Sequence, residues 1–82
     1  DGARTPFLKA RGVGPFGGGG LAVGVGRALM ARQAFTADAF DEVILGCAMP
    51  GPDEANIARV VALRLGCPDQ VPAYTVMRNC AS

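Results

Sequence analysis

An uninterrupted apolar run at residues 43–48, Val-Ile-Leu-Gly-Cys-Ala, constrains the fold more than any other feature of the sequence. Two acidic residues precede it, and a Pro-Gly-Pro segment at residues 50–52 follows it. Short runs of this kind, rich in β-branched residues, are typical of strands that are buried on both faces of a parallel sheet. Parallel strands need a crossover connection, so we expect an α/β architecture.

Two segments with helical spacing of their apolar residues flank this strand. The first covers residues 21–35, and its predicted buried side consists of Leu21, Val25, Ala28, Leu29 and Phe35. Gly24 and Gly26 lie inside it, where glycine costs about 1 kcal/mol relative to alanine. We expect these glycines either to allow close approach of a neighbouring backbone or to delay the start of the regular helix. A short connection follows, with one helical turn capped by Thr36.

The second helix begins after Asp53 or Asn56, either of which can cap it. It ends at Gly66, with Pro68 shortly after, a common C-terminal signal. Its predicted apolar side consists of Ile57, Val60, Val61 and Leu65.

The last segment, residues 71–82, is predicted to form a strand followed by a sharp turn that contains Cys80. Small or polar residues surround this cysteine and allow a helix to start there. At a helix start, unpaired backbone N–H groups and the helix dipole stabilise a thiolate, which is the nucleophilic form of cysteine. The alternative is that Cys80 is a buried packing residue, as free cysteines often are.

Composition excludes several functions. The net charge is +1, the aromatic fraction is 6% and Trp is absent, so neither nucleic-acid binding nor binding to an anionic membrane is indicated. No apolar run is long enough to span a bilayer. The Gly-x-Gly-x-x-Gly match at residues 12–17 has no buried strand before it and contains Pro15, so we interpret it as a surface connection and not as a nucleotide site.

The sequence contains three cysteines without Cys-x-x-Cys spacing and no histidine, so no metal site is expected. We interpret Cys47 and Cys67 as packing residues, and the unpaired thiols favour a reducing compartment. A nucleophilic cysteine usually has a basic partner, most often histidine. We therefore expect the 82 residues to be a fragment of a longer chain, truncated after Cys80.

Four motifs in order resemble the N-terminal part of thiolases, the acyl-CoA C-acyltransferases. Arg4-Thr5-Pro6 resembles the exit from their first strand, and residues 41–46 resemble their second strand. Residues 56–59, Asn-Ile-Ala-Arg, resemble the opening of their second helix. Residues 75–82, Thr-Val-Met-Arg-Asn-Cys-Ala-Ser, resemble their nucleophile segment. Within this family, the sequence of residues 54–59, Glu-Ala-Asn-Ile-Ala-Arg, is more similar to the degradative thiolases of fatty-acid oxidation.

The resemblance implies that Cys80 carries the acyl group as a thioester. The implied reaction is thiolytic cleavage of a 3-ketoacyl-CoA, or the reverse condensation, with coenzyme A and acyl-CoA as substrates and no covalently bound cofactor. The family's histidine base and second catalytic cysteine come from its C-terminal half. Neither Cys47 nor Cys67 lies in a matching motif, and we expect the fragment alone to be inactive.

The implied fold is the opening part of the N-terminal half of a thiolase-like αβαβα layered sandwich. Thiolases are dimers or tetramers, and some act in fatty-acid-oxidation complexes. In this family the strand that leads to the nucleophile lies at the dimer contact, so the resemblance makes Tyr74 and Val76 candidates for a subunit contact. The expected compartment is the cytoplasm, or the mitochondrion or peroxisome in a eukaryote. Two alternatives stay open at this point: a ketoacyl-synthase-type condensing enzyme, and a non-catalytic α/β interaction module with Cys80 in its core.

Overall fold

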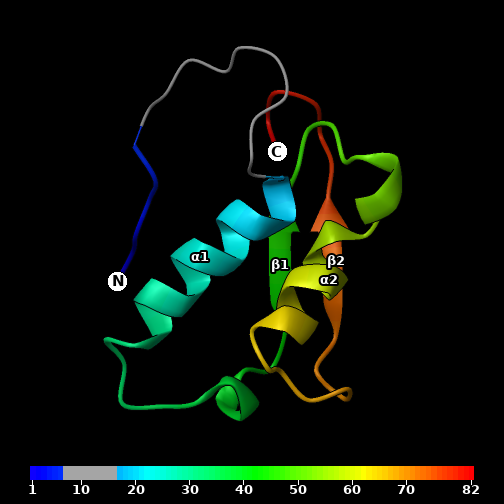
Figure 1. The fold of residues 1–82 in the computed structure, drawn as a ribbon. Helices are drawn as coiled ribbons and strands as arrows, with labels where there is room; N and C mark the ends of the chain where they lie inside the picture. Colours follow the sequence, from blue (N-terminus) through cyan, green and yellow to red (C-terminus); the bar gives the residue numbers. More distant parts are fainter. Residues whose placement is uncertain (7–16) are drawn as a thin grey trace.

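The structure, a computed structural model, describes residues 1–6 and 17–82. Its helices and strands alternate along the chain (Figure 1). In order they are helix α1 (Gly18–Met30), 3-10 turn η1 (Ala37–Ala39), strand β1 (Val43–Gly46), 3-10 turn η2 (Pro52–Glu54), helix α2 (Ile57–Arg64) and strand β2 (Ala73–Val76). The glycine motif at residues 12–17 lies almost wholly outside the described residues.

Strands β1 and β2 pair in parallel, which confirms the predicted α/β class. The register runs from Val43 opposite Ala73 to Gly46 opposite Val76. The ladder extends by one hydrogen bond at each end, from Val43 N–H to the Pro72 carbonyl (2.9 Å) and from Cys47 N–H to the Val76 carbonyl (3.0 Å). Helix α2 is the crossover between the strands, so both strands end on the same side of the molecule (Figure 1).

Helix α2 begins and ends where the sequence predicts. Asn56 is the N-cap, and its side-chain oxygen accepts a hydrogen bond from the Arg59 N–H. Gly66 ends the helix with a φ of 90°, a left-handed conformation that glycine adopts without steric cost. Ala58 and Ala62 are fully buried on the helix side that faces the strands, where their small side chains permit close packing.

Helix α1 packs mainly against α2, and the predicted apolar side of α1 is wrong. Its buried residues are Gly19 and Val23, whereas Leu21 is 42% exposed. Phe35 lies beyond the end of the helix and packs edge-on against Phe40. The reason is that glycines, which an apolar pattern does not count, form part of the contact between the two helices.

Gly26 shows how this contact works. A Cβ atom at this position would lie 2.9 Å from a methyl carbon of Leu65, the C-cap residue of α2. At Gly24, in contrast, an added Cβ would meet nothing within 4 Å. Of the two glycines singled out in the sequence, only Gly26 therefore allows the close approach of a neighbour.

Glu54 stabilises the start of α1 from another part of the chain. The first turn of α1 contains no acidic residue, and its N-cap Gly17 offers no side chain. The Gly19 N–H donates to the Glu54 carboxylate at 3.4 Å, and a Cβ on Gly19 would collide with that carboxylate. A negative charge at this end of a helix is favourable, since the helix dipole is positive there.

The buried residues form two small apolar clusters that share helix α2. One contains Ala37, Ala62, Cys67 and Val71; the other contains Val23, Ile57 and Val61. Cys67 is thus a packing residue, as predicted. Neither described helix has the length and apolar content that crossing a membrane requires.

We expected the strand in residues 43–48 to be buried on both faces. This is wrong for β1 in the part of the chain that the structure describes. Ile44 on β1 lies opposite Tyr74 on β2, and the two side chains are 52% and 44% exposed. Helix α2 packs against both strands, and Ile44 and Tyr74 alternate with the half-buried residues of the ladder. The sheet therefore has one covered face and one apolar, uncovered face.

The two glycines of α1 give a matched test of this packing. Gly24→Ala should stabilise α1 by about 0.5–1 kcal/mol, because alanine is the better helix former and its methyl group meets open space. Gly26→Ala should give a smaller gain or a loss, because Leu65 must move. Native-state hydrogen exchange of the α1 amides measures both effects, and equal gains at the two positions would contradict the proposed contact.

Candidate active site

Cys80 lies on a tight turn directly after strand β2. The Ala81 N–H donates to the Arg78 carbonyl (3.0 Å), and the Ser82 N–H donates to the Asn79 carbonyl (3.1 Å). The Ser82 hydroxyl closes the turn from the other side, since it accepts a hydrogen bond from the Arg78 N–H at 2.5 Å. Residues 77–82 form a turn and no helix, so the structure does not show the predicted helix start at Cys80.

Asn79 gives the turn its shape. Its φ is 51°, and it is the only non-glycine residue with a positive φ in residues 1–6 and 17–82. Asparagine tolerates this left-handed conformation better than most residues, because its short polar side chain can form local hydrogen bonds. The chain therefore reverses direction immediately before the cysteine.

The turn lies over the end of the neighbouring strand. A Cβ atom at Gly46, the last residue of β1, would lie 3.0 Å from the carbonyl carbon of Ser82. Any side chain at position 46 would press on the turn. Cys80 therefore belongs to a segment at the carboxyl ends of both parallel strands, which is where α/β proteins commonly bind ligands.

The three cysteines have different environments. Cys67 is buried, Cys47 is half-buried and packs beside Val23, Ile57 and Val61, and Cys80 is exposed. Because Cys80 is exposed, the structure gives no support to the alternative in which it is a core residue of these 82 residues.

The segment before β2 is fixed by the Asn-x-Ala-Arg motif at the start of α2. The guanidinium of Arg59 donates to the carbonyls of Val71 (3.1 Å) and Asp69 (3.3 Å). Asn56 reaches β2 itself, where its side-chain nitrogen is 3.5 Å from the Ala73 carbonyl. The sequence singled out Asn56 as a possible cap and the motif as a whole by resemblance. The structure adds a physical role for Asn56 and Arg59 in holding the strand that leads to Cys80.

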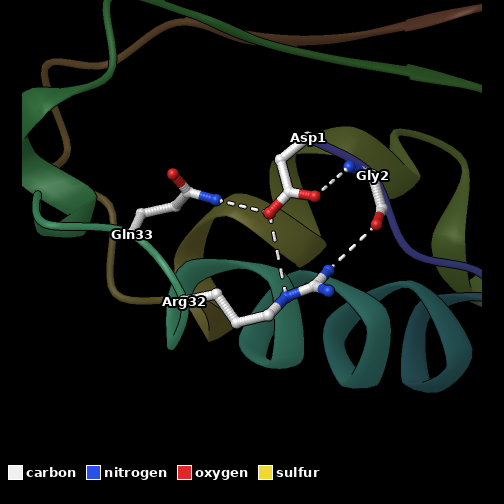
Figure 2. Close-up of polar contacts among 4 residues, drawn as sticks. All are labelled: Asp1, Gly2, Arg32 and Gln33. Carbon is white, nitrogen blue, oxygen red and sulfur yellow. Dashed lines mark hydrogen bonds and ion pairs between the residues drawn. The ribbon is translucent and has the colours of Figure 1, made fainter.

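A second polar group joins the chain start to the end of α1 (Figure 2). The Asp1 carboxylate accepts a hydrogen bond from Gln33 (2.8 Å) and forms an ion pair with Arg32 (3.8 Å). Arg32 also donates to the Gly2 carbonyl at 2.9 Å. The Arg32 and Asp1 side chains are exposed, and exposed ion pairs contribute little stability, typically about 0–1 kcal/mol. We therefore interpret the group as a surface contact.

Arg4 forms a local hydrogen bond. Its guanidinium donates to the carbonyl of the adjacent Thr5 at 3.2 Å.

Within the described parts of the chain, no three His, Cys, Asp or Glu side chains are grouped closely enough to hold a metal ion. The sequence contains no histidine, so these 82 residues supply no histidine base for Cys80.

The family of the chain follows from its match to a family model. The model of the thiolase N-terminal domain matches residues 1–82. The chain belongs to the thiolase family. This confirms the resemblance on which the prediction for Cys80 rests.

Curated thiolases match the whole chain. A beta-ketoadipyl-CoA thiolase of Pseudomonas aeruginosa is 40% identical over 91 residues, which cover 100% of this chain and 21% of that protein. A beta-ketoadipyl-CoA thiolase of Escherichia coli is 35% identical, with the same coverage. A 3-ketoacyl-CoA thiolase of Salmonella newport is 34% identical over 86 residues, covering 100% of this chain and 19% of that protein. The thiolase segment described here thus spans about a fifth of the length of these relatives.

Sequence reasoning missed several residues that shape this thiolase turn. It predicted a turn from the small and polar residues around Cys80, but it gave no individual role to Asn79 or Ser82 and none to Gly46. Two signals for these residues were available in the sequence. One was the asparagine next to the cysteine, and the other was the glycine at the end of a strand. The contact between Gly46 and Ser82 had no signal, because it joins residues far apart in the sequence.

The left-handed turn can be tested at Asn79. Asn79→Gly should keep the turn, because glycine adopts a positive φ freely. Asn79→Val should destabilise it by about 1–2 kcal/mol, since a β-branched side chain is strongly disfavoured in this conformation. Hydrogen exchange of the Ala81 and Ser82 amides reports the change, and equal exchange rates in both variants would contradict the assigned conformation.

Proposed function

We propose that this chain is the nucleophile-bearing part of a longer acyl-CoA C-acyltransferase of the 3-ketoacyl-CoA thiolase type, with Cys80 as the acyl-accepting residue. The observation that carries the proposal is the position of Cys80. It is the exposed cysteine, on a tight turn at the carboxyl ends of two parallel strands, in the motif that resembles the family's nucleophile segment.

The proposed reaction has two steps. The Cys80 sulfur bonds to the keto carbon of a 3-ketoacyl-CoA, the bond between that carbon and its neighbour on the thioester side breaks, and the neighbour takes a proton to leave as acetyl-CoA. The thiol of a second coenzyme A then loses its proton and attacks the acyl-cysteine thioester, which releases a shortened acyl-CoA and the Cys80 thiolate. The reverse sequence is a condensation.

The groups that move protons in these steps must come from other parts of the longer chain, because this segment has no histidine. Cys67 is buried in an apolar cluster and Cys47 packs beside another, so neither is proposed for proton transfer. The contribution of this segment is therefore the nucleophile and its placement.

The names of the relatives support thiolytic chemistry on CoA thioesters, since they include beta-ketoadipyl-CoA and 3-ketoacyl-CoA thiolases. These names, together with the Arg78-Asn79-Cys80-Ala81-Ser82 sequence, favour a thiolase over a ketoacyl synthase. We further propose a homo-oligomer. Tyr74 is the better candidate for its contact, because Tyr74 lies on the uncovered face of the sheet and is more exposed than Val76.

Competitive alkylation of the full-length enzyme tests the proposal. Iodoacetamide should modify Cys80 much faster than Cys47 or Cys67, because a nucleophilic thiolate must be accessible, and acyl-CoA should protect Cys80. Peptide mass spectrometry quantifies each site. Slow, equal labelling of all three cysteines, unchanged by acyl-CoA, would contradict the assignment.

Substitution provides the matched comparison. Cys80→Ser should lower kcat for cleavage of a 3-ketoacyl-CoA by about a thousandfold or more, since removal of a covalent nucleophile commonly has an effect of this size or larger. Cys47→Ser, at a half-buried cysteine outside the proposed site, should retain most of the activity. Full activity in Cys80→Ser would rule out the proposed role.

A further inference from the structure

The start of helix α2 and the middle of strand β2 share one small hydrogen-bond network. The Thr75 hydroxyl donates to the Asn56 side-chain oxygen at 2.8 Å and accepts from the Ala58 N–H at 3.1 Å. The same Asn56 oxygen accepts from the Arg59 N–H at 3.4 Å, and the Asn56 nitrogen lies 3.5 Å from the Ala73 carbonyl. Two residues thus connect the helix to the strand.

This network satisfies donors that a helix start leaves without intrahelical partners. Asn56 takes the N–H of the third helical residue, Arg59, as an ordinary N-cap does. The N–H of the second helical residue, Ala58, is taken by Thr75, which lies 17 positions away in the sequence and on another element. Strand β2 therefore supplies half of the cap of α2.

The location of Thr75 links the network to the candidate nucleophile. Thr75 lies within β2, opposite Leu45, five residues before Cys80. From Thr75 the chain runs directly into the turn that presents the cysteine. The end of that turn rests against Gly46, so a change in the position or tilt of β2 would be passed to Cys80.

Packing and strand formation alone do not explain a hydroxyl at this position. Thr75 is half-buried on the side of the sheet that faces α2, and valine has the same shape and a high strand propensity. A hydroxyl on a packed surface is unfavourable unless it is hydrogen-bonded. What the hydroxyl adds is a directional connection between strand and helix.

We propose that Asn56 and Thr75 are positioning residues for Cys80: together they fix strand β2 to the first turn of α2 and thereby set where the nucleophile lies. This inference rests on the proposed role of Cys80. It assigns no chemical step to either residue, because both act through the backbone of β2.

Thr75→Val in the full-length enzyme is the first test. It removes the donor and the acceptor of the network but keeps the shape of the side chain. The expected result is a loss of kcat of about tenfold to a hundredfold, with little change in KM, since small displacements of a reacting group have effects of this size. Alkylation of Cys80 by iodoacetamide should show a changed pH profile. Thr75→Ser, which restores the hydroxyl, should recover most of kcat.

Val23→Ala is the control for stability. Val23 is buried beside Ile57 and Val61, so its truncation destabilises the same part of the fold without touching the network. Well below its unfolding temperature this variant should keep kcat. If Val23→Ala and Thr75→Val lose kcat equally, the loss reflects stability and the proposal is overturned.

A double variant tests whether the two residues act together. Asn56→Ala combined with Thr75→Val should reduce kcat no further than the worse single variant, because both remove the same connection. Independent, multiplicative losses would overturn the shared role. If Thr75→Val keeps full kcat while Cys80→Ser is inactive, the positioning role fails and the proposed function stands. Activity in Cys80→Ser would defeat the proposed function instead.

Discussion

The parallel pairing of β1 with β2 is the interaction on which the rest of this structure depends. Parallel neighbours cannot be joined by a tight hairpin, so the chain must cross over between them, and helix α2 is that crossover. The pairing also brings the carboxyl ends of both strands to one side. As a result, the turn that carries Cys80 lies over Gly46 at the end of β1.

Close packing around this pair depends on small residues as well as on buried Val and Ile side chains. Ala58 and Ala62 are fully buried on α2, and Gly26 leaves room for Leu65 where the two helices meet. The buried clusters are small, and an apolar face of the sheet stays uncovered at Ile44 and Tyr74. Hydrogen bonds from Asn56 and Arg59 therefore do much to fix the position of β2.

The features that the sequence predicted well are those with local causes. The cap at Asn56 and the end of α2 at Gly66 follow from short-range backbone chemistry. The strand predicted for residues 43–48 follows from β-branched residues between turn signals, although β1 ends at Gly46, two residues earlier. Cys80 could be singled out because its neighbours form a motif. The nature of the turn around it could not be derived, since the left-handed Asn79 depends on how the chain closes onto Ser82.

The features that were missed depend on contacts between distant segments. The buried side of α1 contains Gly19 and Val23 because α2 and Glu54 pack there. The spacing of apolar residues along α1 does not indicate where these neighbours lie. The hydrogen bond between Thr75 and the Ala58 N–H likewise joins two elements. The exposure of one face of the sheet had no local signal either, because it depends on which elements pack against the strands.

Trapping the acyl-enzyme tests the central claim most directly. The full-length thiolase, mixed with a 3-ketoacyl-CoA in the absence of free coenzyme A and quenched within one turnover, should carry the shortened acyl group as a thioester. Peptide mass spectrometry should place that group on the peptide that contains Cys80, and Cys80→Ser should remove it. An acyl group on another residue, or the same amount of adduct in Cys80→Ser, would contradict the account.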